Sequence, residues 1–133
     1  MSTSLKFIIM PDLYLITKTN KREIHNLISM EFKFLSLTFH QGYLTVICDT
    51  ASMPQHFNNS GNTWRGIVIE GQIDFTTSGV LSAAIQPLSG ENVSILVISM
   101  FDTDIIFVRN NDLAKAVNAL TRAGHAISTP VQD

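Results

Sequence analysis

The segment from Trp64 to the C-terminus constrains the fold most, because strand-like and helix-like hydrophobic patterns alternate along it in a definite order. Its strand-like stretches are rich in β-branched and aromatic residues. Of its helix-like stretches, the first has a broad apolar surface and the last has apolar residues on one helical face. The expected elements are strand 64–70, helix 80–88, strand 93–100, strand 104–109, helix 112–123 and strand 125–128. This order is that of the split βαβ motif, β-α-β-β-α-β, which is also called ferredoxin-like.

Single residues mark the expected ends of these two helices. Ser78 is a suitable N-cap for the first helix, because its side chain can accept a hydrogen bond from a free backbone N–H. Pro87 should end or bend the last turn of that helix. Asn111 is a suitable cap for the second helix, and Gly124 can stop it by adopting the left-handed conformation.

The N-terminal half repeats the same order more faintly. Its expected elements are strand 13–17, helix 21–28, strand 32–39 and strand 43–48. A loop rich in Pro, Asn, Ser and Gly, residues 52–62, separates the two halves. We therefore expect an α+β chain of two related subdomains, 1–62 and 63–133, whose antiparallel sheets are joined side by side.

Composition excludes several classes of function. The chain is 45% hydrophobic and 15% charged, with a net charge of −2, so it predicts a core-rich globular protein without the basic face that nucleic acid needs. Cys48 is the only cysteine, which rules out an internal disulfide and favours the cytoplasm. The apolar run 7–10 ends at Pro11 and is too short to span a membrane. We expect a cytoplasmic protein with neither a nucleic-acid partner nor a membrane partner.

The pattern of reactive residues does not predict an enzyme. The four histidines lie in different elements without metal-ligand spacing, and no Gly-x-Ser-x-Gly motif is present. Asp102 and Asp104 form an Asp-x-Asp pair of the kind that sometimes holds Mg²⁺ with a nucleotide, but no phosphate-binding loop lies nearby. We therefore expect no catalytic residue, no metal and no cofactor. A small enzyme that uses Asp102 or Asp104 remains the weakest alternative.

Several motifs in order resemble a family of small tandem ACT-like proteins, many of them bacterial, which is related to the arginine sensors of animal growth-control signalling. The motifs are Trp64, Gly66-Ile67-Val68-Ile69-Glu70-Gly71-Gln72-Ile73-Asp74-Phe75, Gly79-Val80-Leu81, Pro87-Leu88, Val93-Ser94-Ile95, Ile98-Ser99, Thr103-Asp104 and Val108. In the first half only 44–48 matches, and Tyr43 stands where the family usually has Glu. The resemblance implies an ACT-type C-terminal subdomain and a degenerate N-terminal one.

The resemblance also implies a site, since ACT-type sensors bind small ligands, typically amino acids, where two such domains meet. Gly79 begins a helix, where free N–H groups and the dipole would stabilise an α-carboxylate. The related arginine sensor uses the positions that match Gly79 and Asp104, and the Asp104 carboxylate can accept hydrogen bonds from a cationic group. The expected ligand-binding residues are Gly79, Val80, Leu81, Met100, Phe101, Thr103 and Asp104.

Two other interpretations of these residues stay open. Asp102, Thr103 and Asp104 fit an ordinary hairpin turn in which the aspartates bond nearby N–H groups, and Gly79 fits a glycine required only for packing. The leading hypothesis is an amino-acid-binding regulatory protein that holds its ligand between ACT subdomains and acts through a homodimer or an unknown protein partner. The alternative is a non-catalytic interaction or dimerisation module that binds no ligand.

Overall fold

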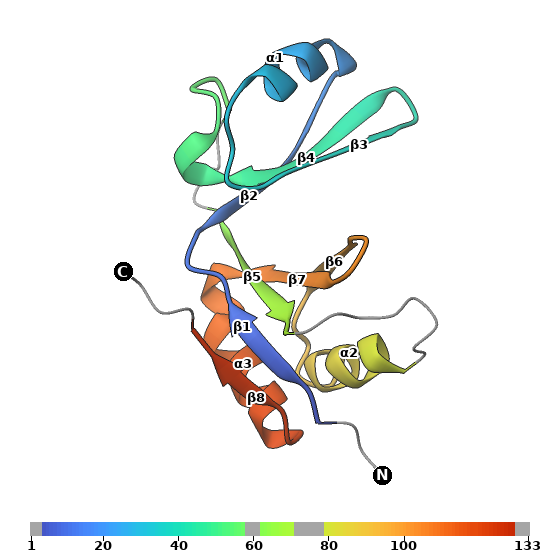
Figure 1. Cartoon of the computed structure of the whole chain (residues 1–133), viewed down its shortest axis with the longest axis vertical. Helices are drawn as coiled ribbons and strands as arrows, with labels where there is room; N and C mark the ends of the chain where they lie inside the picture. Colours follow the sequence, from blue (N-terminus) through green and yellow to red (C-terminus); the bar gives the residue numbers. More distant parts are fainter. Residues whose placement is uncertain (1–3, 58–61, 71–78, 130–133) are drawn as a thin grey trace. The chain divides into compact units, whose positions relative to one another are not determined.

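The computed structural model describes residues 4–57, 62–70 and 79–129 of the chain, which Figure 1 shows. The chain forms two compact units. The N-terminal unit is Asp12–Trp64, and the C-terminal unit combines Met1–Pro11 with Arg65–Asp133. This division differs from the expected 1–62 and 63–133, because the first eleven residues belong with the C-terminal unit.

The sheet of the C-terminal unit has the strand order β6-β7-β5-β1-β8. Its strands are β1 (Lys6–Ile9), β5 (Trp64–Ile69), β6 (Ile95–Ser99), β7 (Asp104–Arg109) and β8 (Ala126–Ser128). All but β1 correspond to expected strands. Phe7 of β1 pairs with Ile69 of antiparallel β5 and with Ile127 of parallel β8, so the N-terminal strand lies between them.

Both helices of this unit share one core with one face of the sheet. They are α2 (Val80–Gly90) and α3 (Leu113–Arg122), and α3 follows the short 3-10 helix η3 (Asn110–Asp112). The buried residues of the core are Phe7, Ile67, Ile69, Ala84, Leu88, Val93, Ile106, Val108, Ala116, Ala119 and Leu120. The apolar residues of α3 therefore cover its own sheet, as the sequence pattern predicts.

The ends of the helices correct two expectations and confirm one. Asn111 does not cap α3, because it lies within η3 and Asp112 occupies the N-cap position, where no side-chain cap bond forms. Of the two effects expected of Pro87, ending or bending the last turn, the first does not occur, because α2 continues to Gly90. Gly124 adopts φ +97° after α3, and the next residue donates to the Leu120 carbonyl, as in a Schellman motif. Ser78, the expected cap of α2, lies outside the described residues.

The N-terminal unit has a sheet of order β3-β4-β2. Its elements are β2 (Tyr14–Thr19), η1 (Lys21–Glu23), α1 (Ile24–Ser29), β3 (Leu35–His40), β4 (Tyr43–Asp49) and η2 (Thr50–Ser52). Leu15, Leu27, Leu44, Val46, Cys48 and Phe57 form a separate core. The expected order of strand, helix and hairpin is present, and the α+β class of the chain is confirmed. Within 12–57 and 62–64 no second α-helix follows the hairpin.

Candidate functional site

Gly79 is the residue at the N-terminal boundary of α2. Its backbone lies in the left-handed region, with φ +88° and ψ −14°, which residues with a side chain rarely adopt. A Cβ atom at this position would meet no described atom within 4 Å, so the space beside the backbone is open. The left-handed backbone conformation therefore favours glycine at position 79, and the described contacts give no support to a role of this glycine in packing.

Among the described residues, no side chain caps the backbone N–H groups of the first turn of α2. The first N–H groups of any α-helix have no acceptor within the helix, and the positive end of the helix dipole lies beside them. Val80 and Leu81 are half-buried here, and Val80 packs against the core of the unit. An anion that reaches this turn would therefore meet N–H donors and a backbone that Gly79 leaves unobstructed.

The turn between β6 and β7 carries the other group of expected residues. The N–H of Met100 donates to the carbonyl of Thr103 at 2.8 Å, which closes the turn. The hydroxyl of Thr103 donates to the carbonyl of Ile69 at 3.1 Å and so anchors the turn at the end of β5. Phe101 is 82% exposed. Since the hydroxyl hydrogen of Thr103 is engaged within the protein, the side chain of Thr103 can offer a ligand only its oxygen lone pairs.

Asp104 is the first residue of β7 and lies opposite Ser99 in the hairpin. Its side chain is half-buried, while that of Asp102 is exposed. In the described part of the chain neither carboxylate accepts a hydrogen bond or forms an ion pair. The hairpin-turn interpretation requires the aspartates to accept hydrogen bonds from nearby N–H groups, and the described contacts show no such bonds.

The structure groups the expected residues into two sets. One set is the start of α2 and the other is the β6–β7 turn, and Figure 1 shows both on the same side of the C-terminal unit. The chain passes from the end of β5 to α2 through residues 71–78, which lie outside the described ranges. Among described residues no hydrogen bond or ion pair joins Asp104 to the first turn of α2. That the two sets bind one ligand stays a prediction.

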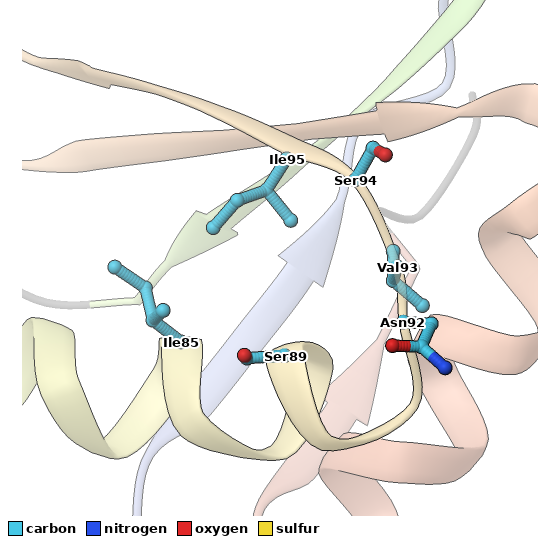
Figure 2. A pocket seen from close by; sticks show the side chains of 6 residues that line it. All are labelled: Ile85, Ser89, Asn92, Val93, Ser94 and Ile95. Atoms are coloured by element: carbon cyan, nitrogen blue, oxygen red, sulfur yellow. The ribbon is translucent and has the colours of Figure 1, made fainter.

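The sequence did not predict a cavity near the opposite end of α2. This open cavity of about 390 Å³ is lined by Ile85, Ser89, Asn92, Val93, Ser94 and Ile95. Figure 2 shows Ile85 of α2 and Ile95 of β6 pointing into the opening, with Ser89 beside them. The volume is typical of a ligand pocket, but no charged side chain lines it to pair with the charged groups of an amino acid.

The part of the chain that the structure describes contains neither a cluster of metal ligands nor a membrane-spanning helix. Among residues 4–57, 62–70 and 79–129, no three His, Cys, Asp or Glu side chains lie close enough together to hold a metal ion. Over the same ranges, no helix has the length and apolar character needed to cross a membrane.

The chain is similar to a named sensor and to solved structures. It is 23% identical over 108 residues to the cytosolic arginine sensor for mTORC1 subunit 1 of Rattus norvegicus, a match that covers 76% of this chain but only 33% of that protein. This chain therefore spans about a third of the relative's length. A crystal structure of a protein from Agobacterium tumefaciens matches at a TM-score of 0.83 and 27% identity, over 98% of this chain and 97% of the other.

The regulatory subunit of aspartate kinase from Thermus flavus shares the fold, with a TM-score of 0.59, 10% identity and coverage of 91% of this chain and 99% of that subunit. At that identity the likeness concerns the fold alone. The ACT domain family matches residues 59–122, which include β5, α2, β6, β7 and α3. The β-α-β-β-α order of these elements agrees with this similarity of residues 59–122 to the ACT domain family.

Proposed function

We propose that this chain is a non-catalytic regulatory protein that binds an amino acid beside Gly79 and Asp104. The observation that carries the proposal is the start of α2, where a left-handed glycine with no described atom within 4 Å of a Cβ precedes a helix of 11 residues that no described side chain caps. Backbone N–H groups at such a helix start are a suitable site for a carboxylate.

In the proposed complex the α-carboxylate lies at the first turn of α2 and the α-ammonium, or a cationic side chain, lies at Asp104. Each charge-assisted hydrogen bond would contribute about 1.5–3 kcal/mol if it is shielded from water. Val80, Leu81, Met100 and Phe101 would contact the rest of the ligand, and Thr103 would accept through its hydroxyl oxygen. These roles rest on the position of each residue at the helix start or in the β6–β7 turn.

The relatives support regulation by a small molecule. One relative is named as a cytosolic arginine sensor, and a protein that shares the fold is named as the regulatory subunit of aspartate kinase. We propose that the ligand is held between ACT subdomains, as in the family, and that the protein acts in the cytoplasm. We propose neither a cofactor nor a nucleic-acid or membrane partner. Binding would favour one conformational state of the protein over another by at most the difference in the ligand's binding free energy for the two states. A protein partner or homodimer would carry the signal.

The proposal is tested by thermal unfolding of the full chain with each standard amino acid in turn. We expect one or two of them to raise the melting temperature, because a ligand that binds only the folded state stabilises it. The rise should be lost in Asp104→Asn, which keeps the shape of the side chain but removes its charge. Asp102→Asn is the matched control, since Asp102 lies in the same turn with an exposed carboxylate, and it should keep the rise.

The alternative is an interaction module without a ligand. It is favoured by β6, an uncharged strand that pairs only with β7 among the described residues and so leaves one edge available. A flat thermal response to every amino acid, together with a stable dimer in light scattering, would support this module and exclude the sensor.

A further inference from the structure

The proline inside α2 leaves one carbonyl of the helix without its usual donor. In an α-helix the N–H of residue 87 would donate to the carbonyl of residue 83, but Pro87 has no N–H. The carbonyl of Ala83 lies instead 3.1 Å from Nε2 of His125. The histidine ring therefore supplies the hydrogen bond that Pro87 cannot.

The other ring nitrogen of His125 contacts the start of β1. The backbone N–H of Leu5 donates to Nδ1 at 3.0 Å. The ring packs edge-on against Phe7, with centroids 5.5 Å apart and planes at 83°, and His125 is only 7% exposed. Its own N–H donates to the carbonyl of Leu120 at the end of α3. This one residue thus joins β1, α2 and the end of α3, which are far apart in the sequence.

These partners fix the protonation state of the ring. The N–H of Leu5 can only donate, so Nδ1 must carry a lone pair, and the carbonyl of Ala83 can only accept, so Nε2 must carry the hydrogen. A second proton on Nδ1 would place an N–H against the N–H of Leu5. The bond to β1 would then be lost, whereas the bond to Ala83 would remain.

Charged side chains on the surrounding elements offer the protonated ring no compensation. Neither α2 nor β8 carries a charged residue, β1 carries Lys6, and α3 carries Lys115 and Arg122. All three cations are exposed, and Arg122 pairs with Glu91 at 2.8 Å. In the described part of the chain no hydrogen bond or ion pair joins any of these four side chains to His125.

We propose that His125 is a pH-sensitive link, which in its neutral form ties β1 to α2 and α3 and in its protonated form releases the start of β1. A proton bound at Nδ1 removes the acceptor that the Leu5 N–H needs, so this proton and the bond to β1 exclude each other. The link does not depend on whether the chain binds an amino acid.

Hydrogen exchange and thermal unfolding between pH 8 and pH 5 test this link. His125→Asn places an amide oxygen near the position of Nδ1 and can keep the bond from Leu5, but it does not titrate. On acidification we expect the protection of the Leu5 amide to fall about tenfold or more in the unmodified chain and to stay constant in His125→Asn. The melting temperature of the unmodified chain should likewise fall further than that of the variant.

His40 provides the control, because it is exposed at the end of β3 in the other unit. His40→Asn removes an imidazole ring without touching the link, so its pH profile should follow that of the unmodified chain. The proposal is wrong if the Leu5 amide stays protected at pH 5, or if His125→Asn loses stability on acidification in parallel with the unmodified chain.

Pro87→Ala keeps the test decisive if His125→Asn alone does not fold. Residue 87 then regains its N–H and can donate to the Ala83 carbonyl, so His125→Asn should cost less stability in this background. The Leu5 amide should still lose protection on acidification when His125 is present. An equal loss of stability in both backgrounds would show that His125 does not replace the missing donor of Pro87.

Discussion

Asp49 is a fully buried carboxylate at the end of β4. Its Oδ1 accepts from the N–H groups of Lys33 at 2.9 Å and Phe34 at 3.1 Å, and its Oδ2 accepts from the Ser52 hydroxyl at 2.6 Å. Burial alone raises the pKa of Asp49, but these hydrogen bonds outweigh burial and hold the pKa below its ordinary 3.8. The carboxylate thus fixes the entry to β3 and the turn after β4.

We expect Asp49→Asn to destabilise the chain by about 1–3 kcal/mol at neutral pH, because the hydrogen bonds lose their charge assistance. The folded pKa lies below the unfolded one, so the stabilisation is present above pH 3.8 and is lost as the pH falls through the folded pKa. Urea unfolding at neutral and acidic pH should show a gap from the unmodified chain that narrows in acid. Asp12→Asn removes a partly exposed ion pair with Lys33 and should cost much less; an equal cost would contradict this account.

Among the elements, the start of α2 at Gly79 can be tested against Gly42, a glycine of nearly the same conformation elsewhere in the chain. Gly79 and Gly42 have φ of +88° and +85°, and a Cβ at either position meets no described atom within 4 Å. Alanine at either site should therefore cost about 1 kcal/mol of stability from backbone strain. Only Gly79→Ala should also reduce the thermal shift caused by an amino acid, since only its methyl group would stand over the first turn of α2. Equal thermal shifts in both variants would move the proposed site away from Gly79.

Elements with strong local patterns could be predicted from the sequence, and those that depend on distant partners could not. Gly124 was predictable, because a glycine directly after a helix favours the left-handed conformation. The continuation of α2 past Pro87 could not be predicted, because the hydrogen-bond donor to the Ala83 carbonyl comes from His125, well beyond the helix. Of the candidate site, the sequence located Gly79 at a helix start and Asp104 at a strand start. That one ligand reaches both does not follow from local patterns, because the two residues belong to elements that are separate in the sequence.

At the scale of the whole molecule, two cores explain why the division of the chain was only partly predictable. Each core contains residues from its own unit alone. The boundary near Trp64 follows from the loop that precedes it. The assignment of β1 to the C-terminal unit does not, because a strand of 4 residues has little pattern and both of its partners, β5 and β8, come from the distant half of the chain. Repetition in the sequence indicated two subdomains but not that the C-terminal one includes β1.

The edge of β6 leads to a prediction about assembly. Ile95 and Val97 pack against the core, so Leu96 and Ile98 lie on the opposite face of the sheet. Soluble proteins usually protect such edges with charge or proline, and β6 has neither. We expect the chain to dimerise through this edge, with a mass in light scattering of twice the 14.7 kDa of one chain. Leu96→Lys should return it to a monomer, whereas Thr38→Lys on β3, an edge strand of the other unit, should not. A monomeric unmodified chain would rule out this edge as an interface, and loss of the dimer in both variants would show that charge alone disrupts it.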